Sequence, residues 1–267
     1  MSSISRVPAF TPTKLSTYRR CPAAYASRYI ERTSTPSEPN PTLARAIGAH
    51  SVIAHALTEY LRQETFPVHL RDLVAAQLPA KDYIDANHRE SDIDLTLSWV
   101  HRALRHFDGT HSIVAVERTF EYVYRGSEEW PEFALRSTVD LVLEHRDGMI
   151  EHIDWKTGSS TWYDAVQTVS SRIVVGAVYP DRKICSTTVY LGSGTSRSAV
   201  LTRPDILETW GEIKALVRSI LHDDNWRPQS NPLCPFCPSY FHGCSLYPGA
   251  VESDSMTDWL ELPTVAL

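Results

Sequence analysis

An aspartate and a lysine stand two residues apart at the end of an apolar segment. The segment 150–158 reads IEHIDWKTG, and the alternation of side chains along a strand places Asp154 and Lys156 on one face. Asp140 lies in the preceding apolar segment, and the sequence HRDGM between the two segments predicts a hairpin turn. Because both aspartates are seven residues from Asp147 in that turn, we expect them to lie side by side on antiparallel strands.

These three side chains could support metal-dependent chemistry. Two adjacent carboxylates repel each other unless a cation lies between them. Mg²⁺ and Mn²⁺ prefer oxygen ligands, and a lysine nearby could orient a water molecule or stabilise charge on a phosphoryl oxygen. The pattern therefore predicts metal-assisted hydrolysis of a phosphodiester bond. A structural ion pair on a solvated sheet face is the alternative, and the residues alone leave it open.

The cysteines form a second pattern. The sequence CPFCPSYFHGC places Cys234, Cys237 and Cys244 within eleven residues, and Cys21 in LSTYRRCPAAY would be a fourth ligand. An odd total of five cysteines, in a chain without a secretory signal, argues against a disulfide framework. Four thiolates suit either zinc or an iron–sulfur cluster, and spacing alone does not separate the two. His242 could replace one of these ligands.

The order of Asp140, Asp154 and Lys156 resembles the PD-(D/E)xK nuclease signature. The form DWKTG is similar to the RecB-like branch, which includes CRISPR-associated exonucleases and phage-encoded relatives. The resemblance implies a DNA exonuclease with Mg²⁺ or Mn²⁺ held by both aspartates and by a histidine on a preceding helix. His55 is the histidine that we favour, and His50 is the alternative.

The same resemblance assigns roles to other residues. Gln167 matches a family glutamine that contacts DNA or the nucleophile, whereas Ser171 stands where the family commonly has tyrosine. In relatives with the cysteine pattern, four cysteines hold a [4Fe–4S] cluster that joins the C-terminal tail to the N-terminal helix.

Glu117 lies on a predicted strand, and we interpret it first as a structural residue. Cys185, in an apolar strand, is predicted to be a buried thiol.

The surrounding pattern predicts an α/β chain with a central mixed sheet, flanked by helices in a restriction-endonuclease-like core. We expect one RecB-like nuclease domain over 1–267. Its parts are a helical region at 13–110, a nuclease core at 111–224 and a cysteine-rich tail at 225–267. Helical periodicity covers 14–32, 43–64, 91–107 with Ser91 as N-cap, 162–176 and 204–224. Alternating segments predict strands between 112 and 158 and again between 183 and 202.

Composition limits the range of partners. A net charge of −6 excludes a basic field over the whole protein, so DNA binding would need a local groove and a metal ion. No apolar segment is long enough to span a bilayer, and we expect a cytoplasmic protein. DNA is the expected partner, together with proteins of recombination or CRISPR adaptation. The rival interpretations are an inactive DNA-binding or recombination module that keeps the cluster, and a structural zinc protein.

Overall fold

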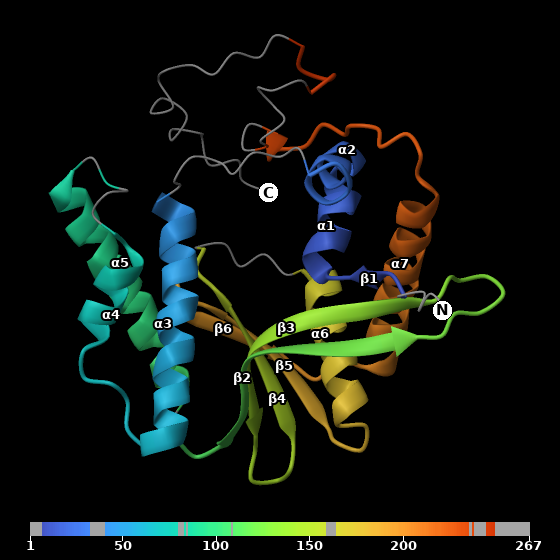
Figure 1. Ribbon diagram of the computed structural model, residues 1–267. Coiled ribbons are helices and arrows are strands. Elements are labelled where there is room, and N and C mark those ends of the chain that lie inside the picture. The colour runs from blue at the N-terminus through green and yellow to red at the C-terminus, as the bar shows by residue number, and fades with distance from the viewer. Residues whose placement is uncertain are drawn as a thin grey trace, which may run out of the picture. The chain divides into compact units, whose positions relative to one another are not determined.

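The computed structural model describes residues 7–32, 41–79, 83, 85–107, 109–158, 164–234, 237 and 244–248. Contacts within the chain divide it into two compact units. The first unit comprises Met1–Ser16 and Glu38–His222, and the second comprises Thr17–Ser37 and Asp223–Leu267. The first unit contains the sheet (Figure 1) and the predicted catalytic residues. The second unit contains four of the five cysteines.

A mixed sheet forms the centre of the first unit. Its strands are β1 (Ala9–Phe10), β2 (Ser112–Tyr124), β3 (Phe133–Glu144), β4 (Ile150–Lys156), β5 (Ile184–Tyr190) and β6 (Thr195–Ala199). The strands run in the order β1-β3-β4-β5-β6, and β2 also pairs with β3. The β1–β3 and β4–β5 pairs are parallel, whereas the other pairs are antiparallel. Gly148 has a φ of +85° in the turn between β3 and β4, which confirms the predicted hairpin.

Helices flank this sheet. Along the chain they are α1 (Pro12–Arg20), α2 (Pro22–Tyr25), the π-helical turn η1 (Ala26–Ile30), α3 (Pro41–Gln63), α4 (Leu70–Gln77), α5 (Ala86–His106), α6 (Ala165–Val178) and α7 (Arg203–His222). In Figure 1, α3, α4 and α5 lie on one side of the sheet, and α6 and α7 lie on the other. This mixed open sheet between helices confirms the predicted α/β fold class with a restriction-endonuclease-like core.

The main hydrophobic core fixes which way β4 faces. Ile153 and Trp155 are buried in one cluster with residues of α3 and α5, among them Ile53 and Val100. Since side chains alternate along a strand, this packing directs the intervening Asp154 to the opposite face, toward α6. The apolar residues of β4 thereby determine the direction of the charged ones.

Two helix boundaries differ from the sequence prediction. The predicted helix over 14–32 is interrupted at Cys21, which is extended with a φ of −162°, because Pro22 starts a new helix and cannot continue the old one. Ser91 is not the N-cap of α5. The cap is Asp85, whose side chain accepts a hydrogen bond from the Asn87 amide, and Ser91 lies one turn inside the helix. Asp85 could have been recognised as a good capping residue.

Aromatic side chains organise the second unit. Tyr25 stacks on Trp226 at 5.7 Å between ring centres, and Tyr18 meets both rings edge-on. Tyr18 Oη donates a hydrogen bond of 2.8 Å to Asp223 Oδ2. These contacts join two segments that are about two hundred residues apart in sequence. Among the residues described, no helix combines the length and the apolar character needed to cross a membrane.

Candidate metal centre and active site

The two aspartates lie where β3 and β4 separate. The antiparallel pairing runs from Glu144 opposite Ile150 to Leu141 opposite Ile153, and Asp140 is the next residue of β3. Its Oδ2 accepts a hydrogen bond of 2.7 Å from the amide of Trp155. The carboxylate thus replaces a ladder partner for that amide, and the bond holds the carboxylate in one orientation.

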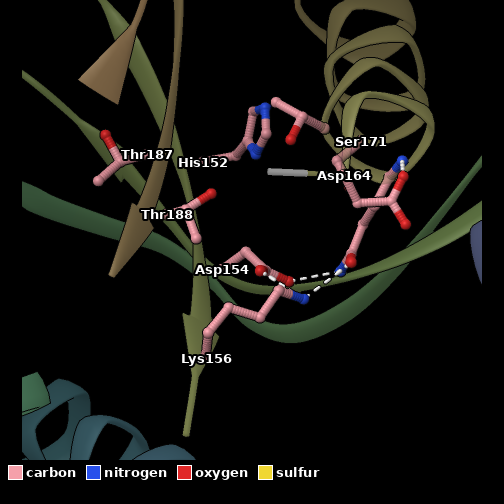
Figure 2. Close-up of a pocket in the computed structure, with 9 residues that line it drawn as sticks. His152, Asp154, Lys156, Asp164, Ser171, Thr187 and Thr188 are labelled. Carbon is pink, nitrogen blue, oxygen red and sulfur yellow. Dashed lines mark hydrogen bonds and ion pairs between the residues drawn. The ribbon is translucent and has the colours of Figure 1, made fainter. Parts of the chain in front are cut away.

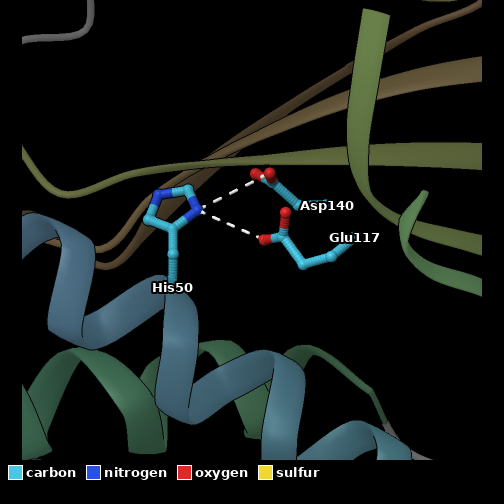
Figure 3. A group of neighbouring side chains, drawn as sticks. All are labelled: His50, Glu117 and Asp140. Atoms are coloured by element: carbon cyan, nitrogen blue, oxygen red, sulfur yellow. Dashed lines mark ion pairs between the residues drawn. The ribbon is translucent and has the colours of Figure 1, made fainter. Parts of the chain in front are cut away.

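The other oxygen of Asp140 belongs to a cluster of potential metal ligands. His50 Nδ1 is 3.5 Å from Asp140 Oδ1 and 3.7 Å from Glu117 Oε1 (Figure 3). One ligand atom from each of these residues lies within 4.8 Å of the others. The three residues come from α3, β2 and β3, so the fold itself brings them together. An imidazole nitrogen with two carboxylate oxygens is a donor set that suits Mn²⁺ and, less closely, Mg²⁺.

The charge of His50 balances the two carboxylates. Burial by itself lowers the pKa of His50, but the hydrogen bonds to Asp140 and Glu117 outweigh burial and raise the pKa to about 10. The imidazole is therefore protonated when no metal ion is present. A bound cation would take over the role of this proton, since a metal ligand must be deprotonated.

Glu117 has an unusual backbone conformation. Its φ is +45°, although it lies inside β2 and is not a glycine. Val116 pairs with Leu141 and Arg118 pairs with Val139, so Glu117 stands opposite Asp140. Left-handed conformations cost free energy in ordinary residues and gather at functional sites. This geometry makes Glu117 a candidate functional residue, whereas the sequence had suggested a structural one first.

On the face of β4 opposite Ile153 and Trp155, Asp154 and Lys156 (Figure 2) form a closed ring of hydrogen bonds with Gln167. Lys156 Nζ is 2.8 Å from Asp154 Oδ2 and donates to Gln167 Oε1 at 2.8 Å. The amide of Gln167 donates to Asp154 Oδ1 at 2.6 Å. The start of α6 positions Gln167, because the N-cap Asp164 accepts a bond from its backbone amide.

Burial raises the pKa of Asp154 to about 6, with Lys156 acting against this shift and Asp140 adding to it. Both carboxylate oxygens accept bonds from the ring, and these bonds stabilise the ionised form. A carboxylate with this pKa responds strongly to a neighbouring cation, which is typical of a functional site.

Five of these six side chains line one cleft, and Glu117 is the exception. The cleft has a volume of about 460 Å³, and its lining includes His50, Asp140, Asp154, Lys156 and Gln167. It opens at the carboxyl end of β4, beside the carboxyl end of the parallel strand β5. The cleft therefore contains a candidate cation site, a further carboxylate and a lysine within a single pocket, as a hydrolytic centre for phosphodiesters requires.

His55 is not part of this group. Its side chain is exposed on α3, one and a half turns beyond His50. Ser171, at the position where the resemblance led us to look for tyrosine, is buried and forms a 2.9 Å hydrogen bond with Ser137. Sequence periodicity placed both histidines on one helix, but it could not show which face meets β2 and β3.

None of the four cysteines of the second unit forms a disulfide bond. The amide of Gln229 donates to Cys21 Sγ at 3.5 Å, and the amide of Asn231 donates to Cys234 Sγ at 3.3 Å. Gln229 also accepts, through its carbonyl, a weak contact of 3.9 Å from Cys234 Sγ. A four-thiolate donor set with amide donors to sulfur fits either an iron–sulfur cluster or zinc. His242 lies outside the described residues.

Cys185 differs from the other four cysteines. It is buried in β5, as predicted, and burial raises the pKa of its thiol. A raised pKa keeps the sulfur in its unreactive thiol form. This residue is therefore a packing residue of the sheet.

Comparison with known proteins adds independent information. The family model of the PD-(D/E)XK nuclease superfamily matches residues 9–240. A solved protein from Eubacterium rectale, which carries the name putative exonuclease, aligns with a TM-score of 0.53 at 9% identity and covers 85% of this chain and 86% of its own. The solved protein SSO0001 aligns with a TM-score of 0.44 at 12% identity, over 92% and 89% of the two chains. No curated protein gives a significant match.

The family match includes the strands and helices that carry both groups of the cleft. The structural similarity to the protein from Eubacterium rectale supports the same fold. With the candidate cation site and the lysine in place, the chain belongs to the PD-(D/E)XK nuclease superfamily of metal-dependent hydrolytic nucleases.

Proposed function

We propose that this protein is a DNA exonuclease of the RecB-like branch that depends on Mg²⁺ or Mn²⁺. One observation carries the proposal: His50 and Asp140 of the candidate cation cluster line the same cleft as the Asp154–Lys156–Gln167 ring. An ion pair on a solvated sheet face would not need a histidine and a strained glutamate beside it.

In this proposal His50, Glu117 and Asp140 hold the divalent ion. A divalent ion bound there supplies Lewis-acid polarisation of a phosphoryl oxygen and lowers the pKa of water. Asp140 is already oriented by the Trp155 amide, so little side-chain order has to be gained on binding. Asp154 lines the same cleft and, as the sequence predicts, is a further oxygen ligand.

Lys156 acts on the substrate. Its ammonium group would orient the attacking water or offset the negative charge that grows on a phosphoryl oxygen during in-line displacement. Gln167 accepts a hydrogen bond from this ammonium group and donates one to Asp154, so it fixes the distance between the two. Gln167 is therefore proposed as the residue that holds the Lys156 ammonium group and the Asp154 carboxylate in fixed relative positions.

The choice of DNA ends over internal sites rests on resemblance. The DWKTG motif is similar to that of RecB-like exonucleases, and the protein from Eubacterium rectale with the same fold carries the name putative exonuclease. We therefore propose linear DNA with free ends, or single strands, as substrate. Recombination or CRISPR-adaptation proteins are the proposed partners.

A [4Fe–4S] cluster bound by Cys21, Cys234, Cys237 and Cys244 is proposed as the structural element of the second unit. The amide donors to two of the sulfurs support thiolate ligands there. Protein purified without air should be brown and contain iron and acid-labile sulfide. A colourless protein with stoichiometric zinc would replace the cluster by a structural zinc site.

The test of the enzyme is a digestion assay with anaerobically prepared protein. Linear single-stranded and double-stranded DNA, labelled at either end, and circular single-stranded DNA are incubated with and without Mn²⁺. We expect Mn²⁺-dependent degradation of a linear substrate, no loss of the circle, and at least a hundredfold lower rate in Asp140→Asn and Lys156→Ala.

Two matched controls use exposed residues away from the cleft. Asp94→Asn, which loses an ion pair with Arg71, and Lys183→Ala should keep wild-type rates. Equal rates in wild type and in the two cleft variants would refute the catalytic assignment. DNA binding without any degradation would instead support the non-catalytic module.

A further inference from the structure

A small cavity lies behind the Asp154–Lys156–Gln167 ring, between β4, β5 and α6 (Figure 2). The space that the centre of a water molecule can occupy there is about 10 Å³, which is the least that holds one water molecule. Each lining residue carries a polar group, although carbon atoms make up the larger part of the cavity surface: His152, Asp154, Lys156, Asp164, Gln167, Thr168, Ser171, Thr187 and Thr188. A buried water molecule is held by hydrogen bonds to polar groups that otherwise lack a partner.

His152 supplies the second observation. It precedes Asp154 by two residues, so both side chains project from the same face of β4. The residue is 2% exposed, and its Nε2 forms a 2.7 Å hydrogen bond with Ser186 Oγ. Its Nδ1 is buried without a hydrogen-bond partner in the described part of the chain. A buried polar atom in this condition costs about 1–3 kcal/mol, so a partner for Nδ1 is expected.

The positive charge near His152 favours a water molecule over a cation in this cavity. A neutral imidazole has one nitrogen that donates a hydrogen bond and one that accepts it. The Ser186 hydroxyl can pair with either kind of nitrogen. Arg172 would repel a second metal ion at this position.

We propose that the cavity holds one ordered water molecule. This water bridges His152 Nδ1 and the Asp154–Gln167 pair by hydrogen bonds, on the side of the pair that faces away from the cleft. His152 is then a positioning residue: it holds the ring through the water and does not touch the substrate. The water site stands on the cavity and on Nδ1 alone, whereas the effect on catalysis rests on the proposed function.

Two substitutions of His152 distinguish the contribution of Nδ1 from that of Nε2. The asparagine amide reaches about as far as Nδ1, whereas the glutamine amide reaches about as far as Nε2. His152→Asn therefore keeps a polar atom toward the cavity and loses the Ser186 contact, and His152→Gln does the reverse. If the water holds the Asp154–Lys156–Gln167 ring in place, His152→Gln should raise the Mn²⁺ concentration for half-maximal digestion about tenfold. His152→Asn should stay close to wild type.

A matched control uses another histidine with the same feature. His111 also has a buried Nδ1 without a hydrogen-bond partner in the described residues, but it packs against His145 and does not line this cavity. His111→Asn and His111→Gln should therefore share one Mn²⁺ dependence. A similar difference between these two variants would attribute the His152 result to general destabilisation and overturn the positioning role.

A high-resolution crystal structure of the wild type decides the water site without reference to activity. We expect an ordered water within hydrogen-bond distance of His152 Nδ1, and its loss in His152→Gln. An empty cavity, or a ring turned so that Nδ1 bonds a protein atom, overturns the inference. An inactive wild-type enzyme with this water in place would refute the proposed function and leave the water site supported.

Discussion

Glu117 provides a sharp test because its backbone and its side chain are expected to have opposite effects. Its φ of +45° inside β2 is a conformation that glycine adopts without penalty. Its carboxylate, however, belongs to the proposed metal site. Replacing it with glycine should therefore stabilise the metal-free protein relative to alanine while both variants lose Mn²⁺-dependent digestion.

The size of the effect follows from two opposing contributions. A left-handed conformation costs an L-residue about 1–2 kcal/mol, and glycine removes this cost. Glycine also gives the unfolded chain more freedom, which destabilises the native state by about 0.4–1 kcal/mol relative to alanine. The net gain for Glu117→Gly over Glu117→Ala is therefore about 0.8 kcal/mol at the centre of a range from about 0 to 1.6 kcal/mol. For a chain of this size that corresponds to about 2 °C in melting temperature.

The assay compares thermal unfolding of Glu117→Gly and Glu117→Ala by circular dichroism in the presence of a chelator. The comparison is matched, because both variants lose the same contacts with His50. A Glu117→Gly variant that melts at or below the temperature of Glu117→Ala would show that the conformation is not strained. Retained Mn²⁺-dependent digestion in either variant would remove Glu117 from the metal site.

Three further predictions concern the core, the second unit and the ring. Ile153→Ala, at a fully buried position of β4, should lower the free energy of unfolding by about 2–5 kcal/mol in urea denaturation; a change below 0.5 kcal/mol would contradict the packing. Burial and the bond to Asp223 raise the pKa of Tyr18 to about 12 from its ordinary value of 10.0, so its stabilisation is complete below pH 10 and is lost between pH 10 and 12. Tyr18→Phe should flatten that loss, and an unchanged pH profile would refute it. Gln167→Ala should lower the digestion rate about tenfold at saturating Mn²⁺, and an unaltered rate would exclude its positioning role.

Much of the fold could be predicted from local pattern. The Asp147–Gly148 turn fixes the β3–β4 hairpin, and alternation then separates Ile153 and Trp155 from Asp154 and Lys156. These features depend on residues close together in the sequence. The side-by-side position of the two aspartates follows from them, although the strands part at this point and a side chain replaces the ladder bond.

The parts that could not be predicted depend on contacts between distant segments. The choice between His50 and His55 depends on how α3 rotates against β2 and β3, and helical periodicity does not determine that rotation. Glu117 meets Asp140 through the register of β2 and β3, which a long connection leaves undefined in the sequence. The water-sized cavity behind Asp154 requires β4, β5 and α6 together.

The central claim is that a divalent ion binds at His50, Glu117 and Asp140. Isothermal titration of the metal-free protein with Mn²⁺ tests it directly, with His50→Ala and His55→Ala as a pair from the same helix. We predict that His50→Ala abolishes the binding heat and that His55→Ala, which changes an exposed residue, leaves it intact. Binding that survives in His50→Ala and disappears in His55→Ala would contradict the proposed site.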